Sequence, residues 1–163
     1  MRPQDIVVLL KIVSFKGGPW QYRDLAASLF MPLSEVSNAI QRNEIAGLMS
    51  GKRNVHRQSL LEFLIYGLHY VFPQVPGTVV TGVPTAHAHP FYAQKFSSEL
   101  PFVWPYEDGP VRGLAIEPLY AQVPRAVLTD SDLYLALASI DIIRVGRTRE
   151  RKVAIDQLQF LLA

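Results

Sequence analysis

The chain has 163 residues, 49% hydrophobic and 18% charged, a composition that supports a buried core and excludes a disordered chain. No apolar run approaches the roughly 18 residues of a membrane span, and without cysteine the chain cannot form disulfides, zinc–thiolate sites or a thiol nucleophile. The first apolar run lacks a small-residue cleavage site, so we expect no signal peptide, no membrane partner and a cytoplasmic location.

Charged residues are unevenly distributed, although the net charge is only +2. Residues 1–59 carry eight Lys and Arg against four acids, residues 60–143 three against eight, and residues 144–163 five against two. A basic first part, an acidic middle and a basic end indicate that these regions have different tasks.

Three short helices are predicted in the first 46 residues. Apolar residues at helical spacing predict a helix over residues 4–15, which a Gly-Gly-Pro run ends. A second helix covers residues 22–29, and after a two-residue turn Pro32 begins a third helix that extends to about residue 46. The next stretch, LMSGKRNVHR, holds a glycine between short polar runs, as is typical of a small β-hairpin.

The remaining chain changes pattern twice. Helical spacing predicts a connecting helix over residues 59–71, whereas residues 72–126 hold nine of the twelve prolines, which favours loops and short strands. Residues 127–163 return to helical spacing and predict a long or bent C-terminal helix, with Asp130 or Ser131 as its N-cap. The predicted fold is therefore mainly α with a smaller β/loop unit.

Polar side chains gather on one face of the third predicted helix. On a helical wheel, Leu33, Val36 and Ile40 lie together on the apolar side. The polar side carries Ser34, Glu35, Ser37, Asn38, Gln41 and Arg42. Asn and Gln pair with adenine, Arg with guanine and Ser with several bases, whereas a solvated helix face usually holds more Glu and Lys. The pattern predicts a helix that contacts DNA bases; the alternative is an ordinary helical core with a polar outer face.

The spacing around this helix resembles the helix-turn-helix of DNA-binding proteins. Small Ala26 would let the two helices cross closely and Val36 would hold the second in place, although Phe30 stands in the turn where glycine is common. The run VSNAIQRNEIAGLM also resembles the recognition helix of bacterial winged helix-turn-helix transcriptional regulators. By this resemblance residues 1–58 form a winged helix-turn-helix domain. Its wing would contact phosphates through Lys52, Arg53 and Arg57.

Residues 59–163 resemble parts of small uncharacterised bacterial proteins that carry the same kind of N-terminal domain. This resemblance does not indicate any particular activity. We expect dimerisation, a partner or an effector to use this region. Arg144, Arg147 and Arg151 would share one helix face. That face could contact phosphate, dock an acidic partner or part of this chain, or simply be solvated.

Candidate catalytic and metal-binding residues are few. His87 and His89 would lie on one face of a strand, but the spacing supplies no third ligand, so we expect no metal. The chain has no phosphate-cradling glycine loop and no G-x-S-x-G motif, so we predict no cofactor and no enzyme. Aromatic residues of the middle block could line a ligand pocket or form the core of a β unit.

The leading interpretation is a dimeric, sequence-specific repressor of transcription that binds double-stranded DNA, because a single winged helix contacts few phosphates. The apolar stripes of residues 4–15 and 130–162 are candidates for the dimer interface. One alternative is a protein-interaction module, such as an antitoxin or adaptor with a toxin-like partner. Another is a metal-dependent hydrolase built on His87 and His89.

Overall fold

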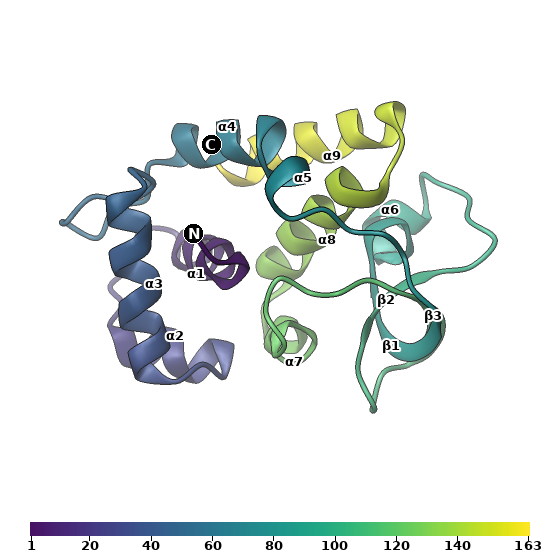
Figure 1. The fold of residues 1–163 in the computed structure, drawn as a ribbon, viewed down its shortest axis with the longest axis horizontal. Coiled ribbons are helices and arrows are strands. Elements are labelled where there is room, and N and C mark those ends of the chain that lie inside the picture. The colour runs from purple at the N-terminus through teal and green to yellow at the C-terminus, as the bar shows by residue number, and fades with distance from the viewer.

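The computed structural model describes residues 1–163 and is mainly α-helical with one small sheet (Figure 1). The fold class expected from the sequence is confirmed at this level. Helix α8 lies between α1 and the sheet, and α3 forms one outer edge of the molecule (Figure 1). No helix combines the length and the apolar character needed to cross a bilayer.

The N-terminal part is built around helix α1, Pro3–Ser14, against which α2 (Tyr22–Leu29), α3 (Leu33–Ile45) and α8 pack. All residues from Asp5 to Ile12 are buried. The apolar stripe of residues 4–15, a candidate dimer interface in the sequence, is therefore part of this chain's own core and is not a free surface.

The connection between α2 and α3 is three residues long. Its first residue, Phe30, adopts a left-handed backbone with φ of 52°, a conformation that glycine usually supplies. The N–H of Met31 closes the turn on the carbonyl of Ala26, at 3.0 Å. The sequence left the turn geometry uncertain because Phe30 stands where glycine is common. The structure forms the left-handed turn with this aromatic residue.

A short hairpin follows α3, as the glycine-containing stretch predicted. Met49 pairs with Val55 as an antiparallel bridge, and the N–H of Ser50 donates to the carbonyl of Asn54 at 2.9 Å. The hairpin leads into α4 (Arg57–Tyr66) and α5 (Leu68–Val71), which Gly67 separates.

The middle block contains a three-stranded closed sheet. Strand β1 (Val79–Thr85) pairs antiparallel with both β2 (Phe102–Pro105) and β3 (Val111–Ala115), which run parallel to each other. Its remaining ordered elements are single helical turns, as nine prolines require. These are η1 (Ala86–Ala88), α6 (Pro90–Ala93) and α7 (Val123–Ala126), and η2 (Val127–Thr129) follows directly after the block.

The C-terminal segment forms two helices, α8 (Ser131–Val145) and α9 (Thr148–Leu161), which pack against each other. Asp130 is the N-cap of α8 and accepts the N–H of Leu133 at 3.0 Å. The chain turns at Gly146, where a side chain would collide with the carbonyl of Ile142. Most of the predicted stripe on α8 is buried and is core, not a free dimer surface.

Buried polar groups join the sheet to α8. Asp141 accepts hydrogen bonds from Thr85 Oγ1 and Trp104 Nε1, both at 2.7 Å, and from Arg144 Nη1 at 3.0 Å. Burial raises the pKa of the Asp141 carboxyl, while the charge of Arg144 opposes this shift. Arg144 also donates to the carbonyls of Phe72 and Glu117 and to the side-chain oxygen of Gln74, so four of its five N–H groups bind acceptors inside the molecule.

The predicted strip of Arg144, Arg147 and Arg151 does not form as one face, although Arg144 contacts the chain's own middle block, which was one of the alternatives. Arg144 is buried at the end of α8, the helix is interrupted at Gly146, and Arg147 is an exposed N-cap of α9. The three residues do not share one helix face, because the helical wheel used for them assumed an unbroken helix.

One cluster of buried apolar residues connects these parts. It extends from α1, α2 and α3 through α8 to the sheet and to α9. It includes residues on both sides of residue 58, so the predicted N-terminal domain and the rest of the chain pack on a shared core.

Candidate nucleic-acid interface

The outer face of α3 presents short, uncharged polar side chains to solvent. The exposed members of the predicted base-reading set are Ser34, Ser37, Asn38 and Gln41. The opposite face is fixed because Val36, Ala39 and Ile40 are buried against α1 and α2. The hydroxyl and amide groups of the four exposed residues are therefore held on a packed helix and are accessible to a ligand.

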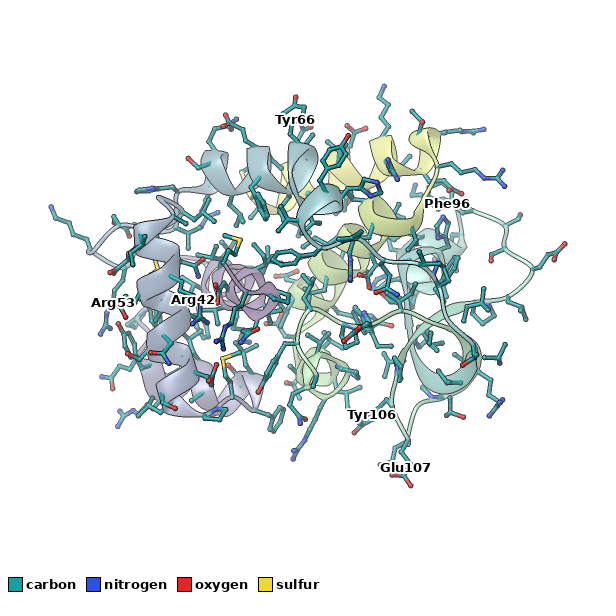
Figure 2. All side chains as sticks on the ribbon, in the orientation of Figure 1. Arg42, Arg53, Tyr66, Phe96, Tyr106 and Glu107 are labelled. Atoms are coloured by element: carbon teal, nitrogen blue, oxygen red, sulfur yellow. The ribbon has the colours of Figure 1, made fainter.

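Arg42, which also belongs to the predicted base-reading set, points inward. Its Nη2 lies 2.8 Å from Oδ1 of Asp5 and its Nε lies 2.9 Å from Oδ2, a two-point contact with a carboxylate that is completely buried (Figure 2). The hydrogen bond to Asp5 raises the pKa of Arg42. Beside it, the Asn43 amide donates to the Asp5 carbonyl at 3.1 Å. Arg42 thus fixes α3 on α1 in this structure and is not available to contact a base.

Glu35 also lies away from the centre of the outer face. It is half-buried, and its carboxylate accepts a hydrogen bond from the Gln4 amide of α1 at 3.4 Å. This placement removes the one acid of the predicted set from the solvent-facing row. A negative charge there would repel phosphate, and the exposed acid of α3, Glu44, lies beyond Gln41 near the C-terminal end of the helix.

Leu33 differs from its predicted place. The helical wheel put it on the apolar side, but as the first residue of α3 it is 55% exposed, because no element covers this end of the helix. With Phe30, which is 38% exposed, it makes an apolar tip beside the α2–α3 turn. Apolar side chains at such a tip can contact the methyl group of thymine.

The hairpin holds one predicted cation in a defined place. Arg53 lies at the outer edge of the molecule (Figure 2), with its guanidinium carbon 5.1 Å from the ring centroids of both Trp20 and Tyr22. Its Nη1 donates to the Trp20 carbonyl at 3.1 Å. Lys52 is exposed next to it. Stacking restrains the Arg53 side chain while leaving its other N–H groups accessible.

Arg57 is used differently from Lys52 and Arg53, the other two residues predicted to contact phosphates. It is half-buried at the start of α4, and its Nη1 donates to the carbonyl of Ala163 at 2.9 Å. It also borders a hollow of about 330 Å³ between the hairpin and the α1–α2 loop, together with Lys52 and Arg53. Its contact therefore ties α4 to the end of α9.

A second aromatic-bound arginine lies beside the turn that leads into α3. The guanidinium carbon of Arg125, on α7, is 3.8 Å from the ring centroid of Phe30. The Tyr120 hydroxyl donates to the Phe30 carbonyl at 3.0 Å. Nothing in the sequence pattern indicates this contact, because Phe30 and Arg125 are far apart in the chain and share no motif.

The two histidines of the middle block have structural contacts. His87 Nε2 lies 3.0 Å from Glu150 Oε1, and His89 Nδ1 accepts the N–H of Phe91 at 3.1 Å. Burial lowers the pKa of His89 to about 4. They lie on and beyond η1 after the end of β1, so they do not form the predicted strand pair. No group of three His, Cys, Asp or Glu residues is placed to hold a metal ion.

Comparison of the chain with protein-family models, with curated proteins and with solved structures gave no match. Function is therefore inferred from the residues and geometry themselves. The candidate interface consists of a row of four uncharged polar side chains on α3, with one arginine stacked on aromatic rings in the hairpin after α3 and another stacked on Phe30 in the turn before it. Such a row can hydrogen-bond to base edges, and such arginines can bind phosphate.

Proposed function

We propose that the protein is a sequence-specific regulator of transcription of the winged helix-turn-helix class. In this proposal α3 enters the major groove and the hairpin after it is the wing. The observation that carries the proposal is the row of Ser34, Ser37, Asn38 and Gln41, all exposed on a helix whose opposite face is packed. An α-helix fits the major groove, where amide side chains distinguish adenine from other bases.

Fixed orientation of α3 supports this role. Asp5 binds both Arg42 and the start of α1, accepting the N–H of Arg2 at 2.9 Å as well as the guanidinium. The Asn43 amide adds a buried contact to the same residue. Because the helix is held at several points, its polar row does not lose much freedom on binding, which favours affinity.

The hairpin would add contacts that do not depend on sequence. Lys52 and Arg53 are exposed on it, and neither forms an ion pair within the chain. Cations on this element would neutralise phosphates and position the helix, while the amides of α3 would discriminate between bases.

The test is selection from random-sequence duplex DNA by the full chain, with affinities measured at two salt concentrations. We expect a steep loss of affinity with salt and an enriched motif. The Lys52→Ala/Arg53→Ala double variant should reduce the salt slope by about 2, whereas the charge-matched Lys95→Ala/Arg149→Ala variant should not change it. Absence of binding by the wild type at low salt contradicts the proposal.

A homodimer is part of this proposal, since two half-sites raise affinity and specificity. Its interface cannot be the buried stripes of α1 and α8. The exposed apolar side chains of residues 66–75 are the better surface: Tyr66 and Tyr70 are 74% and 81% exposed, and Val71 and Val75 are also exposed. Figure 2 shows Tyr66 on the outer side of α4, away from α3. A second copy of the chain is the occupant that we propose.

Sedimentation equilibrium of the full chain tests the dimer. We expect a dimer for the wild type and a monomer for Tyr66→Ser/Tyr70→Ser, with the exposed pair Gln94→Ser/Lys95→Ser as control. The second candidate function, a protein-interaction module, is favoured by the same surface. A wild-type monomer that binds no DNA would favour that function and would contradict the dimeric regulator.

A further inference from the structure

We propose that Arg125 is a DNA contact and that it holds a backbone phosphate beside the N-terminal end of α3. This inference rests on the proposed function and extends it, because Arg125 lies on α7, far outside the N-terminal 58 residues. Through Arg125, the acidic middle of the chain contributes one contact to the DNA-binding surface.

The position of Arg125 is fixed from both sides. Its neighbours Val123, Pro124 and Ala126 are buried, so the backbone of α7 is anchored in the core. Its guanidinium lies on the ring of Phe30 at 3.8 Å. The nearby bond from Tyr120 to the Phe30 carbonyl joins the two segments a second time.

The charge of Arg125 is not neutralised within the chain. The residue is exposed, and all five ion pairs of the structure involve other residues. A guanidinium stacked on an aromatic ring keeps the N–H groups at its edge free to bind an anion. Arg125 is therefore an oriented cation without a partner, next to the turn that leads into α3.

Arg53, in the hairpin that follows α3, and Arg125, at the turn that precedes α3, have the same construction. Each guanidinium lies over an aromatic ring of the α1–α3 region, and each is exposed. Helix α3 has 13 residues, which corresponds to a length of about 20 Å. The major groove is about 12 Å wide and is bordered by phosphates on both sides. A cation beside the start of a helix in the groove is thus close to a flanking backbone.

The direction of binding also favours this position. Recognition helices contact base edges mainly with their N-terminal residues, so the turn before α3 comes close to the DNA. The exposed Leu33 marks this end of the helix as an uncovered surface. Arg125 lies beside the same turn.

The test compares the full-length Arg125→Ala, Arg125→Lys and Arg149→Ala variants with the wild type. The probes are random-sequence duplex DNA and the duplex enriched by the wild type, titrated by fluorescence anisotropy at several salt concentrations. One phosphate contact contributes about 0.9 to the salt slope, so Arg125→Ala should lose about fivefold in affinity at 0.15 M salt on both probes. Arg125→Lys should keep the slope, and the exposed control Arg149→Ala should match the wild type.

The outcomes separate this inference from the function on which it rests. If the wild type binds DNA and Arg125→Ala keeps its slope and affinity, Arg125 only covers Phe30 and the inference is wrong while the regulator remains. A change in melting temperature without a change in slope leads to the same conclusion. If the wild type binds no duplex at low salt, the proposed function itself is wrong.

Discussion

The junction between the sheet and α8 differs from the outer face of α3 in how its polar side chains are used. At the junction Asp141 has three donors, and Arg144 has acceptors for its guanidinium within the chain. On α3 the exposed serines and amides point to solvent. The first arrangement stabilises the fold, because buried charges must be paired. The second has no role in the fold and is available for binding.

Arginine shows the same contrast within one residue type. Arg144 is buried and Arg42 is bound to a buried carboxylate, whereas Arg53 and Arg125 are stacked on rings and exposed. Neither the number of arginines nor their spacing along the sequence distinguishes the paired arginines from the stacked, exposed ones. What separates them is whether a carboxylate of the chain lies within reach.

Removal of Arg144 should have the largest effect on stability. In Arg144→Met the Asp141 carboxylate stays buried without its cation, which should cost about 3–5 kcal/mol in the free energy of unfolding. Urea unfolding measures this loss, and DNA preference should be unchanged in the folded protein. A loss below about 1 kcal/mol would show that the junction does not depend on this pair.

Replacement of Arg42 tests whether it fixes α3 or contacts bases. Arg42→Ala leaves Asp5 buried and unpaired, so we expect a loss of about 3 kcal/mol in stability. Because α3 then loses an anchor, affinity should fall on all DNA sequences together. A stable Arg42→Ala variant with a changed preference at one base pair would instead assign Arg42 to base contact.

His89 should make stability depend on pH between about 4 and 6.5. Its folded pKa of about 4 lies below the usual value for histidine, so the unfolded chain binds the proton more readily. The stability it contributes is complete above pH 6.5 and is lost as the pH falls toward 4. Protonation also removes the acceptor at Nδ1 for the N–H of Phe91.

Urea unfolding at pH 7 and pH 4.5 should show this loss, on the order of 2 kcal/mol for the wild type, and a much smaller one for His89→Asn. Hydrogen bonds lower the pKa of the Asp130 and Glu150 carboxyls, although burial opposes the shift, so most of their contribution is lost below this range. These carboxyls and Asp141, whose pKa burial raises, are present in both proteins, so the comparison with His89→Asn isolates the histidine. An equal loss in both proteins would mean that another group titrates in this range.

Local patterns in the sequence predicted the local structure well. The three helices of the first 46 residues, the turn at Phe30 and the hairpin follow from spacing within windows of about 15 residues, and the structure has all of them. The row on α3 also follows from one helical wheel. Leu33 was misplaced because the wheel gives a direction but does not show whether anything covers the helix end.

Contacts between distant residues could not be predicted in this way. The pairing of Arg42 with Asp5 and the stacking of Arg125 on Phe30 depend on how α1 and α7 pack, which no single-sequence pattern encodes. The turn at Gly146 had only a single glycine as its signal, so α8 and α9 were predicted as one long or bent helix with Arg144, Arg147 and Arg151 on one face.

The most direct test of the central claim is the DNA preference of Asn38→Ala. Selection from random duplex DNA should give a motif that matches the wild type except for relaxed preference at one position per half-site, with a loss of about 1–3 kcal/mol on the wild-type site. The amide control Gln94→Ala should keep the full motif. An unchanged motif and unchanged affinity for Asn38→Ala would contradict the assignment of α3 as the helix that contacts bases.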